Sequence, residues 1–430
     1  MTVRGPAGYD ATAGIGMARY GTKRTSVAAF AFALGVSSSA AASPYPLFGP
    51  GARAPALAGT GVASASGIDG LYLNPAGLTG LRGKHLRLGA VAGDLSLRGS
   101  GGAIDRPVDD PLGFDVGLGL LVPLGGVLRD RVFFGATLYA PPDVIARIRV
   151  PEAGEPYFTL LESRTQLVGV LTGLAVRFDR RWSAGVSVLA LGGLRGTIDL
   201  ITDGSGRVAA ATRADTIVTM APIAGVRFEP GPRLELGLVV RGPARSSYHV
   251  DVNNKLGAEI PISIPPILLA GVAHYDPLTV AAEAAVRASA RWRLTAQVGY
   301  ERWSALPIPS RDPVESMREQ TAPGFRDTLV PRAAAEWSPG DRITLRGGYA
   351  FVPTPAAALL EDRALIDNHR HVFTGGAGFA VGGAAPMRLD LWIQHHRLVE
   401  RDYPMVGDRP AFVSSGSISA IGVGIEVELE

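Results

Sequence analysis

The chain has 430 residues and no cysteine, which excludes disulfides and thiol chemistry. Its 47% hydrophobic and 19% charged residues are ample for a large core or a closed barrel. The 55 glycines exceed the usual share of about 7%, which disfavours a helical protein and favours strands, turns and close backbone contacts.

The N-terminus has the order of a secretory signal peptide. A basic cluster at 19–24 precedes an apolar run, Val27 to Val36, and then small residues that end at Ala42. The apolar run is too short to span a bilayer, which needs about 20 residues. We expect cleavage near Ala42; a disordered tail is the alternative. Removal of residues 1–42 takes four of the 42 basic and one of the 39 acidic residues, so 38 of each remain and nothing in the balance supports nucleic-acid binding.

Small, nearly uncharged residues dominate the segment that follows the signal. The stretch GTGVASASGIDGLYLNPAGL, residues 59–78, ends in the run Asn74-Pro75-Ala76-Gly77 before its last leucine. Proline removes a backbone donor and fixes φ, and asparagine turns the chain while bonding nearby backbone groups. Alanine and glycine allow another chain segment to approach closely. The run therefore predicts a compact, uncharged corner.

Alternation of apolar and polar residues predicts β-strands through the rest of the chain. In 292–301, for example, Trp292, Leu294 and Val298 share one face, and polar residues occupy the other. We expect fourteen strands, an even number as in single-chain bacterial barrels. The expected strands are 84–98, 113–124, 131–150, 156–178, 182–202, 213–229, 233–251, 261–275, 291–304, 326–338, 341–353, 369–382, 386–401 and 414–429.

The connections between these strands alternate in length. Tight turns such as 179–181 and 339–340 separate longer links such as 305–325. Short periplasmic turns and long external loops are typical of an outer-membrane barrel, whereas a soluble periplasmic sandwich has no reason to keep that order. One link is exceptional: 276–290 is long where a short turn is due, and its Ala, Glu and Arg residues predict a short helix from Val280 to Ala290.

Several segments resemble the FadL/TodX family of outer-membrane transporters for hydrophobic compounds. These segments are LYLNPAGL at 71–78, the Trp303-Ser304 pair, Gly347 to Phe351, Ile366 to Arg370 and Gly375 to Phe379. The resemblance implies an all-β fold: a 14-stranded antiparallel transmembrane β-barrel with an N-terminal hatch inside the lumen. It divides the chain into a signal region at 1–42, a hatch at 43–83 and a barrel at 84–430.

In that family a hydrophobic ligand enters from outside, binds in the lumen and leaves sideways into the membrane beside a kinked third strand, with no coupled energy source. The resemblance makes Asn74, Pro75, Ala76 and Gly77 the hatch or gate; an Asn-Pro turn without a gating role is the alternative.

Pro141 and Pro142 in the expected third strand are candidates for the kink, because proline cannot sustain a ladder. The family usually has a proline, an aromatic residue and a glycine here, whereas this chain has Pro-Pro-Asp. The alternative is a strand that simply ends at Ala140.

Apolar side chains in the expected hatch are candidates for ligand contact. The four that we single out are Leu47, Phe48, Leu71 and Leu73, although a packed plug that does not touch ligand would use the same residues. Arginines facing the lumen, such as Arg293 or Arg346, could meet the carboxylate of a fatty acid. The expected partners are a hydrophobic, fatty-acid-like small molecule and the lipid and lipopolysaccharide of the Gram-negative outer membrane, and we expect a monomer.

No catalytic residue, metal or cofactor is predicted. His369 and His371 share a strand face near His395-His396, but no cysteine or carboxylate framework accompanies them. The chain contains no G-x-S-x-G elbow and no Walker A loop. A general porin or structural barrel is the main alternative to a transporter, and an outer-membrane lipid hydrolase is a lesser one.

Overall fold

The computed structural model describes most of the chain beyond the expected signal. The described residues are 44–100, 112–121, 130–140, 157–158, 160–161, 168–202, 208–255, 267–307, 310–311, 323–356, 365–382, 386–404 and 411–429. The predicted signal peptide and the predicted kink at Pro141 and Pro142 lie outside them. In the described part, no helix is long and apolar enough to cross a membrane.

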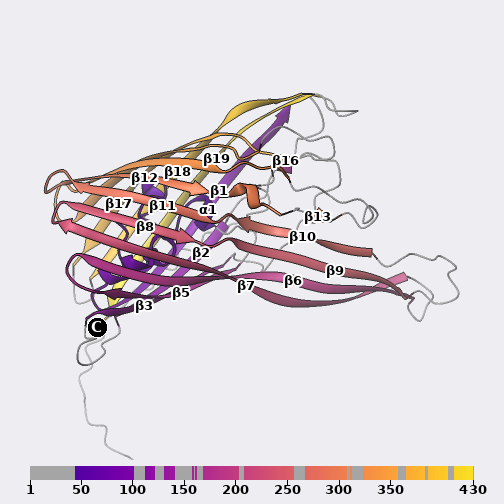
Figure 1. Cartoon of the computed structure of the whole chain (residues 1–430), viewed down its shortest axis with the longest axis horizontal. Coiled ribbons are helices and arrows are strands. Elements are labelled where there is room, and N and C mark those ends of the chain that lie inside the picture. Colours follow the sequence, from indigo (N-terminus) through magenta and orange to yellow (C-terminus); the bar gives the residue numbers. More distant parts are fainter. Residues whose placement is uncertain are drawn as a thin grey trace, which may run out of the picture. The chain divides into compact units, whose positions relative to one another are not determined.

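Antiparallel strands pair in sequence order and close into a ring (Figure 1). The ring runs through β1 (Lys84–Ser100), β2 (Leu112–Leu121), β3 (Val132–Ala140), β5 (Gly169–Arg177), β6 (Trp182–Thr202), β7 (Val208–Gly231), β8 (Leu234–Arg241), β11 (Thr279–Arg287), β12 (Trp292–Glu301), β14 (Thr328–Trp337), β15 (Ile343–Val352), β17 (Arg370–Val381), β18 (Met387–Tyr403) and β19 (Phe412–Leu429). Pairing of β19 with β1, from Lys84 opposite Leu429 to Ser100 opposite Val413, closes it.

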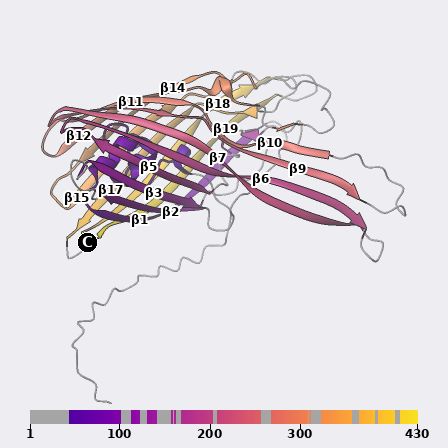
Figure 2. The ribbon, with the colours of Figure 1, turned by 60° about the horizontal axis from the view of Figure 1, so that its bottom comes forward.

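Five further strands complete the part of the chain that the structure describes. They are β4 (Tyr157–Phe158), β9 (Ala244–Lys255), β10 (Ile267–Asp276), β13 (Ser310–Arg311) and β16 (Leu365–Ile366). β4 and β16 form a small parallel pair, while β9 and β10 extend the wall beyond β8 and β11. In Figures 1 and 2, β6, β7 and β9 continue past the ends of the other labelled strands, on the side away from the chain's C-terminus.

The apolar side chains of the ring strands point outward. In β12, Leu294 is 48% exposed while Gln297, on the opposite face, is 8% exposed. The same inversion recurs in β18, where Ile393 faces outward and Gln394 is buried. An outward apolar band around a polar interior is the pattern of a barrel that spans a membrane. The all-β barrel predicted from the alternation is therefore confirmed.

Two predicted elements need correction near the middle of the chain. The link 276–290 contains no helix; Thr279–Arg287 is β11, paired on both edges with β8 and β12. The helix propensity of this segment is outweighed by β-pairing, because Ala281, Glu283 and Ala285 point inward from the strand and are buried. The strand expected at 233–251 is also two strands, β8 and β9, separated at Gly242-Pro243.

Residues 44–83, here called the N-terminal segment, form short helices rather than strands. These are α1 (Pro44–Leu47), η1 (Pro55–Leu57), η2 (Gly67–Asp69), α2 (Gly70–Leu73) and η3 (Pro75–Gly80). Elements η2, α2 and η3 pack against β3, β5, β6 and β7, whereas η1 packs against β14, β15, β17 and β18. A segment that contacts strands on opposite sides of the ring lies within it, as Figure 1 shows.

Candidate functional site

Asn74 fixes the predicted corner of the N-terminal segment to the barrel wall. The side chain is 1% exposed, and its Nδ2 donates to the carbonyl oxygens of Val62 at 2.6 Å and Val226 at 2.9 Å. Its Oδ1 accepts from the amide of Ala76 at 3.1 Å and so caps η3, with Pro75 in the first turn. One amide group thus orders the corner and ties it to β7.

Glycines in the wall make room for this corner. A Cβ on Gly225 would overlap the side-chain oxygen of Asn74, and a Cβ on Gly185 would lie 2.5 Å from the carbonyl carbon of Pro75. Within the segment, a Cβ on Gly77 would lie 2.7 Å from the carbonyl oxygen of Ala65. The four predicted residues are therefore brought together at one close contact with β6 and β7, and their gating role stays a prediction.

Glu283 of β11 holds a second part of the segment. Its carboxylate accepts from the amides of Gly61 at 2.5 Å, Val62 at 2.7 Å and Ser64 at 3.0 Å, and from Ser64 Oγ at 2.8 Å. The side chain is buried, so these donors replace the water that a carboxylate would otherwise need. Sequence reasoning missed Glu283 because it placed this residue in a helix.

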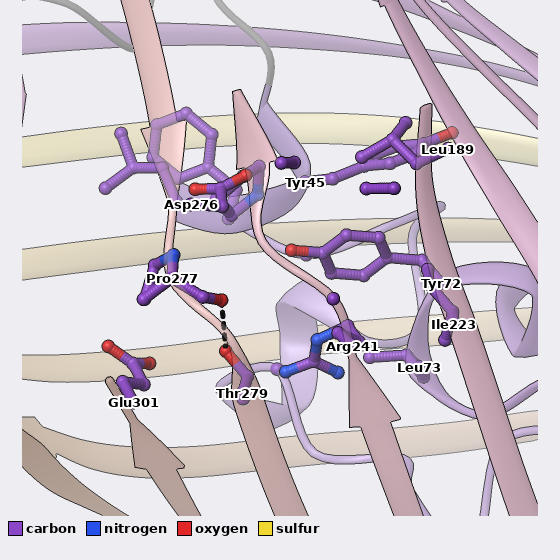
Figure 3. A pocket seen from close by; sticks show the side chains of 18 of the residues that line it. Tyr45, Tyr72, Leu73, Leu189, Ile223, Arg241, Asp276, Pro277, Thr279 and Glu301 are labelled. Atoms are coloured by element: carbon purple, nitrogen blue, oxygen red, sulfur yellow. Dashed lines mark hydrogen bonds between the residues drawn. The ribbon is translucent and has the colours of Figure 1, made fainter. Parts of the chain in front are cut away.

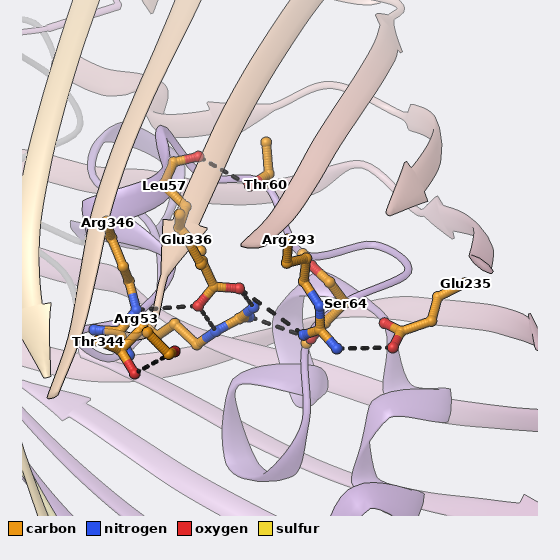
Figure 4. A network of polar contacts seen from close by, with 12 residues as sticks. Arg53, Leu57, Thr60, Ser64, Glu235, Arg293, Glu336, Thr344 and Arg346 are labelled. Atoms are coloured by element: carbon orange, nitrogen blue, oxygen red, sulfur yellow. Dashed lines mark hydrogen bonds and ion pairs between the residues drawn. The ribbon is translucent and has the colours of Figure 1, made fainter. Parts of the chain in front are cut away.

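An ionic network joins the segment to the wall on another side (Figure 4). Arg53 forms two hydrogen bonds with Glu336, and Arg346 bridges Glu336 at 3.2 Å and Asp390 at 2.6 Å. Arg293 pairs with Glu235 at 2.8 Å. Arg293 and Arg346 therefore already have protein carboxylates as partners, which corrects the expectation that they would meet a ligand's carboxylate.

Two small cavities lie on either side of α1. The first, here called the lumen cavity, has a volume of about 80 Å³ and lies between the N-terminal segment and the strands β6, β7, β8 and β11 (Figure 3). The second has a volume of about 40 Å³. Pro46, Leu47, Glu301 and Arg332 line both cavities. The lumen cavity is smaller than the roughly 150 Å³ that accommodates benzene.

The predicted ligand-contact residues separate into two groups. Leu47, Phe48 and Leu73 line the lumen cavity. Leu71 does not; it is fully buried and packs against Gly135 and Gly173 of the wall. Tyr45 and Tyr72 also line the cavity, and their rings lie 5.6 Å apart. The sequence pattern does not identify these tyrosines as cavity residues, although Tyr72 stands beside the LNPAG run.

Two arginines in the lumen cavity have no carboxylate partner among the described residues. Arg332 Nη1 donates to the carbonyl oxygen of Ala58 at 2.6 Å, and the guanidinium of Arg241 lies 5.1 Å from the ring centre of Tyr72. Figure 3 shows Arg241 and Tyr72 reaching into the same space. The nearby Glu301 carboxylate instead accepts from Trp303 Nε1 at 2.8 Å. Asp276 and Glu301 line the same cavity, so it contains two basic and two acidic side chains, although neither arginine forms a salt bridge among the described residues.

A third cavity, here called the end cavity, lies where the C-terminal end of β19 pairs with the start of β1. Its volume is about 380 Å³, and apolar residues such as Val381 and Ile425 line it together with charged ones. Arg53, Asp69, Arg87, Asp390 and Glu426 all contribute to it. Salt bridges join Arg87 to Asp69 and His85 to Glu426, so these charges are paired within the protein.

The ring, its outward apolar band and the buried N-terminal segment define a FadL-type β-barrel. The structure of a Pseudomonas aeruginosa FadL homologue matches with a TM-score of 0.59 and 13% identity, over 91% of this chain and 98% of that one. The Pseudomonas putida toluene transporter TodX matches with a TM-score of 0.57 and 16% identity, over 89% and 99%. The Ralstonia pickettii toluene transporter TbuX gives 0.53 and 14%, over 88% and 99%.

A relative with a similar sequence supports the same class of protein. Alkane uptake protein A of Marinobacter nauticus is 25% identical over 391 residues, which cover 84% of this chain and 86% of that protein. No family model matches the chain. The predicted resemblance to the FadL/TodX transporters and the predicted outer-membrane location are confirmed, and the relatives are uptake proteins and channels rather than enzymes.

Proposed function

We propose that this chain carries hydrophobic compounds passively across the outer membrane and that its N-terminal segment acts as a hatch. The observation that carries the proposal is the lumen cavity, which is lined by Phe48, Tyr45 and Tyr72 but has a volume of only about 80 Å³. Burial of a hydrocarbon is worth about 0.8 kcal/mol per CH₂. A long chain thus supplies enough free energy to displace part of the segment.

Complementation of a deletion strain tests this proposal. Cells that carry the gene should take up labelled oleate, hexadecane or toluene faster than cells with an empty vector. A chain inserted correctly in the outer membrane that accelerates none of the three contradicts the proposal. Correct insertion is checked by the shift in gel mobility that folded barrels show before heating.

A fatty acid is the substrate class that we favour over a plain hydrocarbon. The support is the pair Arg241 and Arg332, which line the lumen cavity and form no salt bridge among the residues described, although Asp276 and Glu301 line the same cavity. A guanidinium binds a carboxylate with charge-assisted hydrogen bonds. Alkanes, as for the Marinobacter nauticus relative, would use the apolar wall and gain nothing from these cations.

Substitution of Arg332 separates the two substrate classes. Arg332→Met should slow uptake of labelled palmitate while leaving uptake of hexadecane, which has the same number of carbons, nearly unchanged. Arg332→Lys, which keeps the positive charge, should retain most palmitate uptake. An equal loss for both substrates in Arg332→Met would show that the residue acts through packing and would contradict a head-group role.

The exposed side chains on the outer face of the barrel indicate its environment. The exposed apolar band on strands such as β12 and β18 matches hydrocarbon, so outer-membrane lipid and lipopolysaccharide are the proposed neighbours and a monomer is the proposed state. Release sideways into this lipid is part of the proposal. The third-strand prolines Pro141 and Pro142 remain candidates for it, outside the described residues.

A further inference from the structure

The outer face of the wall becomes polar toward the end of the barrel that lies away from the C-terminus. On β18 the outward residues Leu391 and Ile393 are followed by His395 and Arg397, which are also exposed. Tight turns such as 339–340 join the strands at the end that carries the C-terminus. In an outer-membrane barrel such turns face the periplasm, so the polar stretch lies at the outer boundary of the membrane.

Strand register brings four basic side chains together at this boundary. Arg397 of β18 is paired with His371 of β17, and His395 lies two residues before Arg397 on the same outward face. His369 lies just before the start of β17 and is exposed. We call these four residues, His369, His371, His395 and Arg397, the outer basic patch. The neighbouring His396 does not belong to it, because this side chain points inward and is 2% exposed.

The imidazoles of the outer basic patch contact the protein through Nδ1. The backbone amide of Thr354 donates to Nδ1 of His369 at 3.0 Å, so the neutral ring carries its proton on Nε2. Nδ1 of His371 lies 2.8 Å from the hydroxyl of Tyr349. When that hydroxyl donates, the proton of His371 is also on Nε2. These contacts orient both rings and leave an N–H group available to a ligand.

The cations of the outer basic patch are not neutralised by carboxylates of the described residues. Arg397 forms neither a hydrogen bond nor a salt bridge within this part of the chain. Nδ1 of His395 lies 3.1 Å from Ser419 Oγ of β19, and Asp94 of β1 lies one strand further away in the same register. Glu400 is exposed further along β18 and forms no salt bridge with the patch. The patch therefore offers several donors to an anion.

Three aromatic side chains lie beside the patch on the outer face. Phe351 of β15 is paired with His371, and their ring centres are 5.2 Å apart. The ring of Phe351 also lies 5.7 Å from that of His369. Phe373 is paired with Tyr349, with ring centres 5.4 Å apart. Aromatic rings at a membrane boundary lie at the level of the lipid head groups, so the outer basic patch lies beside head groups rather than acyl chains.

We propose that the outer basic patch binds a phosphate group of lipopolysaccharide. The phosphates of this lipid are attached to the sugars that carry its acyl chains, so they lie where the apolar band of the barrel ends. The guanidinium of Arg397 suits two phosphate oxygens, and Nε2–H groups of the imidazoles suit the others. The acyl chains then lie on Phe373 and Ile393. The inference rests on the proposed lipopolysaccharide surroundings and deepens them by assigning a binding site.

Native mass spectrometry of the full chain in detergent with added lipid A, the membrane anchor of lipopolysaccharide, tests the proposal. The natural chain should bind bisphosphorylated lipid A about tenfold more tightly than dephosphorylated lipid A with the same acyl chains. Arg397→Gln should lose most of this preference, His371→Gln/Arg397→Gln should lose all of it, and Arg397→Lys should retain part. The control Arg342→Gln removes an exposed positive charge at the other end of the wall and should keep the full preference.

Two further probes identify the source of the phosphate. Inorganic phosphate should not displace lipid A, and the Arg397 substitutions should weaken binding of lipid A more than that of phosphatidylglycerol. Displacement by inorganic phosphate, or equal weakening for both lipids, indicates a general anion site and overturns the proposal. An unchanged preference for phosphorylated lipid A in folded Arg397→Gln overturns it as well. Failure of the natural chain to accelerate uptake of any hydrophobic compound instead rejects the proposed transport function, so the two failures are distinguishable.

Discussion

At the scale of single residues, two polar side chains hold the N-terminal segment against the wall. Asn74 bonds across to β7, and Glu283 collects four donors from Gly61 to Ser64. Each is buried, so its removal leaves donors or acceptors without partners. Such groups cost about 1–3 kcal/mol each when left unsatisfied. These two residues should therefore control how readily the segment moves.

Substitution of Asn74 should loosen the segment without unfolding the barrel. Asn74→Ala removes the bonds that the side-chain amide donates to the carbonyl oxygens of Val62 and Val226, and a buried polar group left unsatisfied costs about 1–3 kcal/mol. Amide hydrogen exchange should become faster in residues 60–80 and stay unchanged in β18 and β19. Asn74→Asp, which places a buried carboxylate against the same two carbonyl oxygens, should loosen the segment at least as much. Unaltered exchange in the alanine variant would show that the corner is held by packing alone.

At the scale of elements, hydrogen bonds within the turns define where strands end, which the alternation of apolar and polar residues does not. The turn between β5 and β6 is one example. Asp179 Oδ1 accepts from the backbone amides of Arg181 and Trp182, both at 2.7 Å. The bond from Arg181, and then that from Trp182, lowers the pKa of the Asp179 carboxyl below its usual 3.8. The ionised carboxylate is thus the form that holds the turn.

This turn predicts a small pH dependence with a definite sign. Because the folded pKa of Asp179 is lowered, its contribution to stability is present above 3.8 and is lost as the pH falls through the folded pKa. Asp179→Asn keeps an acceptor oxygen but does not titrate there. Thermal unfolding in detergent measures this effect. As the pH falls below 3.8, the asparagine variant should lose slightly less stability than the natural chain. A steeper loss in that variant would reverse the assigned sign.

At the scale of the whole molecule, the N-terminal segment and the ring depend on each other. The ring leaves glycines such as Gly185 and Gly225 where the segment needs space, and the segment fills a lumen that would otherwise be open. A barrel of this size without its filling should conduct ions, as porins do. The small volumes of the lumen cavity and its neighbour indicate a plugged state.

Planar-bilayer conductance checks this plugged state. The natural chain should show little steady current, whereas a variant lacking residues 44–83 should show a stable, ohmic pore. Gel mobility before and after heating controls for folding of the deleted variant. A large steady current through the natural chain would favour the porin alternative over a transporter.

The sequence by itself determined the barrel and its membrane setting. Alternation at period two, tight turns such as 179–181 and the LNPAG run are local patterns, and each is visible without knowing what pairs with what. It could not determine the element at 276–290, because Ala, Glu and Arg favour a helix until β8 and β12 offer a ladder on both edges. The sequence also could not show which arginines form salt bridges with carboxylates of the protein.

Only the tertiary structure decided which charges are paired and where the β-ladder is interrupted. Arg346 is joined to Glu336 and Asp390, whereas Arg332 donates to the carbonyl oxygen of Ala58 and forms no salt bridge among the described residues, and nothing in the flanking sequence distinguishes the two. Pro222, Pro243 and Pro277 are far apart along the chain and meet at one level only through strand register. Pairing across the sheet is a long-range property, so local pattern cannot supply it.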